Sequence, residues 1–244
     1  MTLLEVAGIV QRYGPLRALD GVDFAVSDGQ FHGLVGPNGS GKSTLMKCIA
    51  GAEIPAQGVV RFAGRDITTL PPARRAKLGI SLKFQITSVM PSLTVYDNVL
   101  LALQAGDRLR DLVRSATRRD YDGRIRDNLE RFRLSARSDD LAGILSHGQQ
   151  QWLEIAMALV RRPRLLLLDE PTAGMSPEER RATAEILQPI REHCAMVIVE
   201  HDLDFIRDLC DRLTVLSQGT VVDSGTVDDI QNSDKVREVY LTRV

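Results

Sequence analysis

Apolar residues gather in short runs near both ends of the chain, and helical spacing replaces these runs in the middle. In the first third, the runs predict strands over residues 3–10, 22–27, 30–35, 57–62 and 79–84. A turn around Tyr13 joins the first two strands, and a glycine-rich turn over residues 36–41 follows the third. We expect a helix to begin after this second turn and to run over about residues 42–50. Pro71 and Pro72 indicate a break before the fifth strand.

The strand pattern disappears from about residue 94 to 160. Apolar residues here recur at the spacing of one helix face, beginning with Val95, Val99, Leu100 and Leu103. Residues 107–137 contain ten arginines and six acidic residues. Such a stretch is more typical of solvated helix faces than of a nucleic-acid patch. We therefore interpret residues 88–160 as a helical insertion in a single domain, between core segments 1–87 and 161–244.

The last third returns to strands that alternate with helices. Residues 165–169 form a continuous apolar run, which is typical of a strand covered on both faces in a parallel sheet. We predict a second buried strand, two helices and a hairpin, over residues 195–200, 176–192, 203–209 and 213–223. Alternating strands and helices indicate a parallel sheet. The predicted fold is therefore α/β, with a mainly parallel sheet, a small antiparallel β region and an inserted helical subdomain.

Composition excludes several classes of protein. The 244 residues carry a formal net charge of −1, so no overall field draws the chain to nucleic acid or anionic lipid. Three scattered cysteines, Cys48, Cys194 and Cys210, predict buried thiols in a reducing compartment. The sequence predicts neither a secretion signal nor a spanning segment. If the protein works at a membrane, another chain must hold it there.

The glycine-rich turn matches a phosphate-binding motif. Gly36, Pro37, Asn38, Gly39, Ser40, Gly41, Lys42 and Ser43 satisfy G-x-x-x-x-G-K-[ST] between a predicted strand and a predicted helix. The glycines let successive backbone N–H groups face an anion, and the helix start adds its positive dipole end. Lys42 can reach the outer phosphates, Ser43 can hold Mg²⁺, and Thr44 can add a hydroxyl contact. The sequence therefore predicts a P-loop nucleotide triphosphatase core.

Two acidic residues follow the most apolar strand. Asp169 at the carboxyl end of a buried strand suits a role in binding Mg²⁺. Glu170, next to it, can polarise an attacking water as a general base. These acids strengthen the phosphate-loop interpretation, because both motifs need the same metal ion.

A third motif indicates which family of P-loop nucleotide triphosphatases the chain resembles. Leu145-Ser146-His147-Gly148-Gln149 resembles the L-S-G-G-Q signature of ATP-binding cassette (ABC) ATPases. Four further elements resemble those of the family in the expected order: the adenine-stacking aromatic Tyr13, the Q-loop Gln85, the D-loop 173–176 and the switch histidine His201. His32, within a predicted strand, is interpreted as structural. The resemblance covers essentially the whole chain.

The resemblance implies a mechanism. In the family, two cassettes pair head to tail and sandwich two ATP molecules, so that the signature of one chain completes the site of the other. It implies that Ser146, His147, Gly148 and Gln149 contact the partner's ATP. It also implies that Ser43, Asp169 and Gln85 hold Mg²⁺ and that Lys42 neutralises developing charge. Glu170 then polarises the water, and His201 positions the water and the γ-phosphate.

A closer likeness is to the ATPase subunits of importers for hydrophobic, branched-chain amino acids and for urea. It implies two membrane permease subunits, a second ATPase subunit and, indirectly, a substrate-binding protein, at the cytoplasmic face of the inner membrane. Residues 86–93 resemble the surface that receives a permease helix. Three residues depart from the common family pattern: His147, Ser176 and Trp152.

Two other functions compete with the transport ATPase. A soluble ABC ATPase acting on nucleic acid or on protein assembly often has twin cassettes or long coiled-coil insertions, and the sequence predicts neither. A regulatory GTPase switch would need a guanine-reading element like N-K-x-D, whereas this chain carries the ABC-like signature. We expect no nucleic-acid partner.

Overall fold

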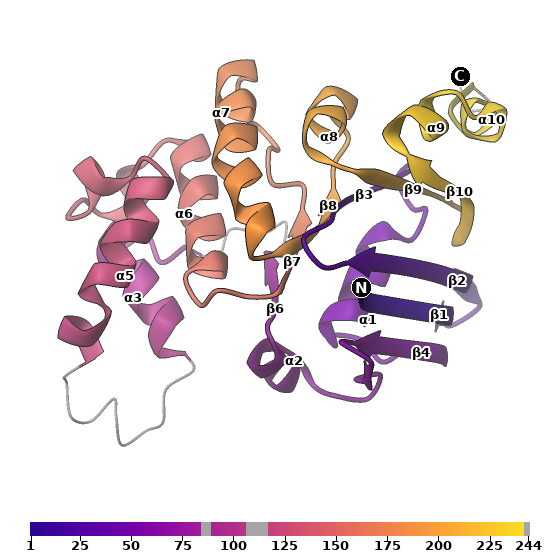
Figure 1. The fold of residues 1–244 in the computed structure, drawn as a ribbon, viewed down its shortest axis with the longest axis horizontal. Helices are drawn as coiled ribbons and strands as arrows, with labels where there is room; N and C mark the ends of the chain where they lie inside the picture. The colour runs from indigo at the N-terminus through magenta and orange to yellow at the C-terminus, as the bar shows by residue number, and fades with distance from the viewer. Residues whose placement is uncertain (84–88, 106–116, 242–244) are drawn as a thin grey trace.

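The computed structural model describes residues 1–83, 89–105 and 117–241. Two sheets and the helices around them make up this part of the chain (Figure 1). The predicted α/β class with a mainly parallel sheet, an antiparallel region and a helical part is confirmed. Among the helices described, none has both the length and the apolar character needed to cross a bilayer.

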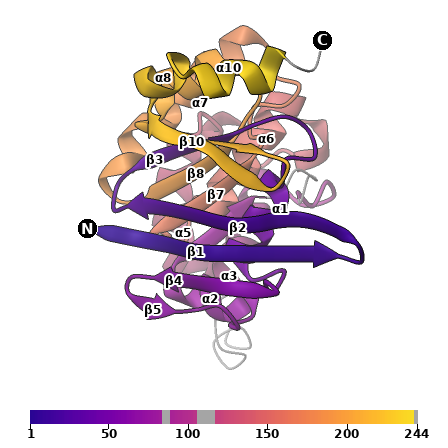
Figure 2. The same cartoon turned by 90° about the vertical axis from the view of Figure 1, so that its right-hand side faces the viewer.

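One sheet is antiparallel and carries the N-terminus. Its strand order is β2-β1-β4-β5, and its long strands lie across the face shown in Figure 2. The bounds are Thr2–Tyr13 for β1, Leu16–Ser27 for β2, Gln57–Phe62 for β4 and Arg65–Asp66 for β5. β1 pairs with both β2 and β4, so it is an inner strand, and it is longer than the strand predicted over residues 3–10.

The second sheet is parallel except at one edge. Its order is β10-β9-β3-β8-β7-β6, and only β10 runs antiparallel to its neighbour. The bounds are Phe31–Val35 for β3, Ile80–Lys83 for β6, Leu165–Asp169 for β7, Ala195–Val199 for β8, Arg212–Ser217 for β9 and Thr220–Thr226 for β10. The carboxyl ends of β3, β7 and β8 therefore meet at one edge, where the phosphate loop, the acid pair and the switch histidine follow.

Helices cover the two faces of the parallel sheet unequally. Helix α1 (Lys42–Ala50) packs against both sheets, and α2 (Pro72–Leu78) lies at the start of β6. Helices α7 (Pro177–Leu187), α8 (Leu203–Leu209), α9 (Val227–Gln231) and α10 (Asp234–Leu241) follow in the last third of the chain. Figure 1 shows α7 and α8 side by side above the parallel strands.

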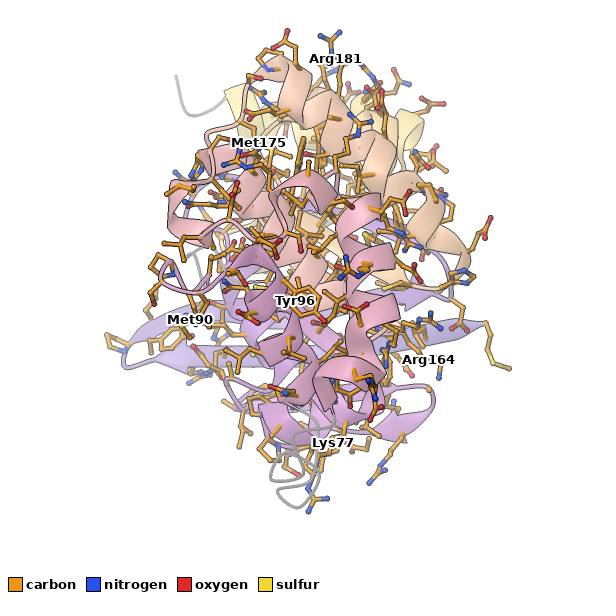
Figure 3. All side chains as sticks on the ribbon, turned by 90° about the vertical axis from the view of Figure 1, so that its left-hand side faces the viewer. Lys77, Met90, Tyr96, Arg164, Met175 and Arg181 are labelled. Carbon is orange, nitrogen blue, oxygen red and sulfur yellow. The ribbon has the colours of Figure 1, made fainter. Side chains whose placement is uncertain are left out.

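A separate helical group forms one end of the molecule. It contains α3 (Val95–Gln104), α5 (Thr117–Arg131) and α6 (His147–Leu159), with 3-10 turns at Ser135–Arg137 and Ala142–Ile144. These helices form the face drawn in Figure 3, where Tyr96 lies centrally and Met90 lies at the margin. Over residues 94–105 and 117–160, the helical character predicted from the spacing is confirmed.

The four leucines of β7 show why this strand is apolar throughout. Leu165 and Leu167 belong to the core shared with α1 and the antiparallel sheet. Leu166 and Leu168 belong to the core on the other face, which includes residues of α6, α7 and α8. Successive side chains point to opposite faces of a strand, so each face of β7 is buried by a different layer.

Three expectations from the sequence need correction. Pro71 and Pro72 were expected to interrupt the secondary structure, but Pro72 is the first residue of α2. A proline is tolerated there because the N–H of the first helical residue has no partner within the helix. The helix predicted over residues 176–192 becomes a 3-10 helix at Gln188–Glu192, since Pro189 cannot donate the next backbone bond. The helices α9 and α10 were not predicted.

Candidate functional site

The phosphate loop fits into a space that admits only glycine at two positions. Gly36 and Gly41 have φ angles of 146° and 105°. A Cβ on Gly36 would lie 2.1 Å from the carbonyl oxygen of Leu216, and one on Gly41 would lie 2.6 Å from that of Ala18. The loop is therefore held between β2 and the end of β9, and any side chain at these positions would displace it.

Lys42 lies inside this loop. Its Nζ donates to the carbonyl oxygens of Gly36 at 2.6 Å and Pro37 at 3.0 Å. Burial lowers the pKa of Lys42, while the nearby carboxylates of Glu170 and Asp169 oppose the shift. A polyphosphate would add further negative charge beside the ammonium and favour its charged form.

A groove of about 870 Å³ opens over the loop. Its lining includes the predicted ligands Tyr13, Asn38, Gly39, Ser40, Gly41, Lys42, Ser43, Thr44, Glu170 and His201. Arg17 and Gln218 also line it, although sequence reasoning did not select them. Residues from distant parts of the chain thus meet in one groove, next to a helix N-terminus that favours anions.

Asp169 lies at the end of β7, with the Ser43 hydroxyl close to its carboxylate. The pKa of Asp169 is raised, mainly by burial and secondly by the neighbouring Glu170 carboxylate. Ser43, Lys42 and Lys83 oppose this shift. A hydroxyl and a carboxylate oxygen side by side are the hard oxygen ligands that Mg²⁺ prefers. A divalent cation here would also offset the cost of a buried carboxylate, so the residues present fit this ion.

Glu170 and His201 form the central polar contact of the groove. His201 Nε2 donates to Oε1 of Glu170 across 3.0 Å. Glu170 has a φ of 48°, a left-handed conformation that costs a non-glycine residue about 1–3 kcal/mol and is enriched at active sites. Its backbone N–H donates to the carbonyl of Val199, which fixes this turn against β8. The sequence predicted both residues, and the structure brings them together.

Glu200 is a site residue that sequence reasoning missed. It is 5% exposed, and its Oε1 accepts from both the N–H and the hydroxyl of Thr172 at 2.7 Å. Its Oε2 accepts from the N–H of His201. This carboxylate therefore ties the turn after Glu170 to the start of the His201 loop. An acidic residue directly after an apolar strand was the available signal, as it was for Asp169.

Tyr13 lies at the rim of the groove with 42% of its surface exposed. Its hydroxyl donates to Oε2 of Glu53, a partner that the sequence did not suggest. Burial, and after it the bond to Glu53, raises the pKa of Tyr13. The ring is thus tethered and still accessible, as an adenine-stacking aromatic requires. Gln85, the predicted Q-loop residue, lies outside the described residues.

The signature residues lie away from this groove. Ser146 is the N-cap of α6: its side chain accepts from the N–H of Gln149, and the Gln149 side chain accepts from the N–H of Ser146. Ser146 and His147 are exposed, and among the described residues none of Ser146, His147, Gly148 and Gln149 lines the groove over the phosphate loop. The chain therefore presents a second helix N-terminus that its own site does not use.

The three departures from the common family pattern have partners inside the chain. His147 Nε2 donates to the carbonyl oxygen of Ala173 at 2.9 Å. Ser176 forms a capping box with Glu179 at the start of α7, so a serine performs the capping that an aspartate otherwise can. Trp152 donates through Nε1 to Thr183 at 2.8 Å. His147 thus connects the signature helix α6 to the loop after β7, and Trp152 connects α6 to α7. Ser176 stabilises the start of α7.

Comparison with known proteins decides the family. The sequence pattern of the ABC transporter family matches residues 19–173, which is more than half of the chain. The chain belongs to the ABC transporter family. It is an ABC ATPase, and its phosphate loop and acid pair are consistent with that activity.

Relatives of this ABC ATPase match more than nine-tenths of its length. The high-affinity branched-chain amino acid transport ATP-binding protein BraF of Pseudomonas aeruginosa is 32% identical, covering 98% of this chain and 97% of BraF. LivG of Escherichia coli K12, which carries the same description, is also 32% identical with the same coverage. The methionine import ATP-binding protein MetN 1 of Paraburkholderia xenovorans is 35% identical over 93% of this chain and 66% of its own length.

Solved structures of ABC cassettes have the same fold. An ATP-binding cassette of an ABC transporter superposes with a TM-score of 0.87 at 31% identity, over 98% of this chain and 99% of that one. A cassette in its ADP conformation gives a TM-score of 0.86 at the same identity, over 99% of each chain. Nucleotide binding is therefore a property of close structural relatives.

Proposed function

We propose that this chain is the ATP-hydrolysing subunit that powers an importer for hydrophobic, branched-chain amino acids. The observation that carries the hydrolytic part is the contact between Glu170 and His201, 3.0 Å apart beside the phosphate loop. The end-to-end similarity to BraF and LivG supports the cargo class. The same similarity favours an amino acid over urea, and a transport subunit over a soluble ABC ATPase acting on nucleic acid or protein assembly.

The residues of the groove have different roles in hydrolysis. Lys42 and the loop N–H groups bind and neutralise the transferred phosphoryl group. Ser43 and Asp169, together with Gln85, would hold Mg²⁺, which would neutralise charge on the phosphate oxygens. Glu170 takes the proton of the attacking water, and His201 orients Glu170 and the water.

A second cassette completes each site in this proposal. Ser146 and the N–H groups at the start of α6 form an anion-binding surface that does not line the chain's own groove. A head-to-tail pair would bring this surface to the partner's ATP. We propose that the chain forms one ABC domain, with a core of residues 1–87 and 161–244 and a helical subdomain of residues 88–160.

The membrane partners would bind near the first turn of the helical group. Gly143 donates its N–H to the carbonyl of Pro91, which joins the segment before α3 to the turn before α6. The exposed apolar side chains Met90, Leu141 and Ile144 lie on these two segments. They suit docking of two permease subunits, which would hold the chain at the cytoplasmic face of the inner membrane and link it to a substrate-binding protein. The predicted docking residues 86–88 lie outside the described residues.

Glu170→Gln tests the hydrolytic assignment. The amide keeps the size of the side chain but cannot accept the proton of water. We expect the variant to bind ATP–Mg²⁺ as the wild type does, to hydrolyse it at least about a hundredfold more slowly and to accumulate as a dimer with ATP. Turnover at the wild-type rate would remove Glu170 from the mechanism.

Purification of the tagged chain from gently solubilised membranes tests the transport assignment. We expect two polytopic subunits and a second ATPase to accompany it, and their binding protein to bind leucine, isoleucine or valine. Binding of urea or methionine instead would correct the cargo alone. Recovery with nucleic acid or assembly factors and no polytopic subunit would overturn the transport function while leaving the ATPase chemistry intact.

A further inference from the structure

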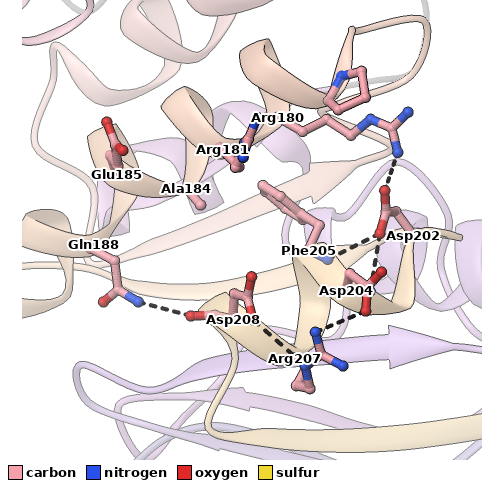
Figure 4. Close-up of a pocket in the computed structure, with 11 residues that line it drawn as sticks. Arg180, Arg181, Ala184, Glu185, Gln188, Asp202, Asp204, Phe205, Arg207 and Asp208 are labelled. Carbon is pink, nitrogen blue, oxygen red and sulfur yellow. Dashed lines mark hydrogen bonds and ion pairs between the residues drawn. The ribbon is translucent and has the colours of Figure 1, made fainter.

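Arg180 reaches across a groove between α7 and α8 (Figure 4). The groove has a volume of about 720 Å³, and both Arg180 and Asp202, the residue after the switch histidine, line it. Its Nη1 forms an ion pair with Oδ2 of Asp202. Its Nε donates to the carbonyl oxygen of Met175 at 3.2 Å. One guanidinium therefore binds the end of the loop after β7 and the end of the loop after β8.

Asp202 uses its two carboxylate oxygens for different partners. Oδ1 accepts from the N–H groups of Asp204 and Phe205, both at 3.0 Å, and so caps the start of α8. Oδ2 faces Arg180. The backbone bond from Phe205 and the bond from Arg180 lower the pKa of Asp202, so the carboxylate is charged near neutral pH. The orientation of Asp202 is therefore set from both sides.

His201 directly precedes Asp202 and contacts Glu170. Half of the His201 side chain is exposed, so packing alone does not fix its ring. Glu200 holds the loop on the N-terminal side of His201 through Thr172. Arg180 holds it on the C-terminal side through Asp202. The position of the ring thus depends on both attachments.

We propose that Arg180 is a positioning residue for hydrolysis, which fixes the loop of His201 through Asp202 and thereby maintains the contact between His201 and Glu170. This inference rests on the hydrolytic roles proposed above for Glu170 and His201. Arg180 does not line the groove over the phosphate loop. Its loss should therefore lower the rate of hydrolysis without weakening ATP binding.

A set of variants of the full-length chain separates this role from a general effect on stability. Arg180→Ala removes the ion pair, and Asp202→Asn removes the charge while keeping the side-chain oxygen that caps α8. Arg180→Lys restores a positive charge opposite Asp202. Arg181→Ala is the matched control, because Arg181 is the next residue of α7, lines the same groove and forms an exposed pair with Glu178.

We expect Arg180→Ala and Asp202→Asn each to lower kcat about tenfold, with KM for ATP within about twofold of wild type. The double variant should lose no more than about the larger single loss, because both substitutions break one interaction. Arg180→Lys should recover kcat to within about threefold of wild type, and Arg181→Ala should leave it unchanged.

Three results would overturn the proposal: a kcat for Arg180→Ala equal to that of Arg181→Ala, an increase in KM at unchanged kcat, or a loss of kcat that follows a lower Tm. Glu170→Gln, measured beside these variants, distinguishes a failure of the proposed hydrolytic function from a failure of the positioning role of Arg180. If it hydrolyses ATP like the wild type, the proposed function of the site fails. If it is inactive while Arg180→Ala is unaffected, only the positioning role fails.

Discussion

The Nε2 of His147 donates to the carbonyl oxygen of Ala173 at 2.9 Å, which joins the start of the signature helix to the loop after the acid pair. The ring also packs against Gly174, where an added Cβ would lie 3.0 Å from both Cδ2 and Nε2 of His147. Gly174 has a φ of 74°, so the loop adopts a turn that suits glycine and accepts the ring beside it. A carbonyl can only accept, so the neutral Nε2–H form and the cation of His147 both make this bond.

His147→Gly restores the residue that is common at this signature position but deletes the bond to Ala173. We expect kcat for ATP to fall about fivefold, which corresponds to the roughly 1 kcal/mol of one hydrogen bond. His147→Gln keeps a donor and should retain most of the activity. Steady-state ATPase measurements on the three proteins check this, and equal rates for the glycine variant and the wild type would contradict it.

Lys83 in β6 and Glu154 in α6 form an ion pair at 3.3 Å with side chains only 2% and 1% exposed. Lys83→Met removes the ammonium that faces a buried carboxylate, and we expect it to lower the free energy of unfolding by about 3–5 kcal/mol. Lys83→Met with Glu154→Leu should recover most of this loss, since neither charge then stays buried. Urea unfolding measures both variants.

Arg133 and Glu185 provide the control for that prediction, because their ion pair is exposed. Arg133→Met should change the free energy of unfolding by less than about 1 kcal/mol. If Lys83→Met and Arg133→Met lowered the free energy of unfolding by similar amounts, burial would not be the cause of the loss predicted for Lys83→Met.

Arg75 is fully buried and donates to four backbone carbonyl oxygens: those of Cys48, Ile49, Thr68 and Leu70. Two of these carbonyls belong to α1, the helix that begins at the phosphate loop. Arg75→Met would leave them without their donor, and we expect a loss of at least about 3 kcal/mol in the free energy of unfolding. The exposed neighbour Arg74→Met should unfold like the wild type in the same urea titration.

His32 gives the protein a predictable dependence on pH. Burial, followed by Arg212, lowers the pKa of His32 to about 4, against an ordinary value of 6.5, while Asp211 opposes the shift. The unfolded chain therefore takes up the proton first, and stability is full above pH 6.5 and falls as the pH drops toward 4. The shift corresponds to about 3 kcal/mol by the usual conversion.

His32→Leu should remove the part of the acid sensitivity that protonation of His32 causes. We expect the loss of unfolding free energy between pH 8 and pH 4 to be smaller in the variant than in the wild type by about 3 kcal/mol. His193→Leu is the control, since that side chain is 75% exposed. A wild-type pH profile in His32→Leu would show that His32 does not cause the acid sensitivity.

Several features of the fold and site follow from local sequence. The phosphate loop was predictable because its glycines, lysine and serine lie within eight consecutive residues, between a strand and a helix. The four leucines before Asp169 predicted a strand buried on both faces, and the two cores on either side of β7 confirm it. Proline at residue 72 was ambiguous, because the same residue interrupts a helix and begins one.

The sequence by itself therefore determined the α/β class, the ATPase chemistry and the candidate residues for it, since periodicity and short motifs act over a few neighbouring residues. Only the tertiary structure decided which of these residues touch. His201 meets Glu170, Arg180 meets Asp202, and Lys83 meets Glu154 across 31, 22 and 71 positions of the chain. The physical reason is that such contacts depend on the order and register of strands β6, β7 and β8 and on the packing of α6 and α7 beside them, which no local pattern specifies.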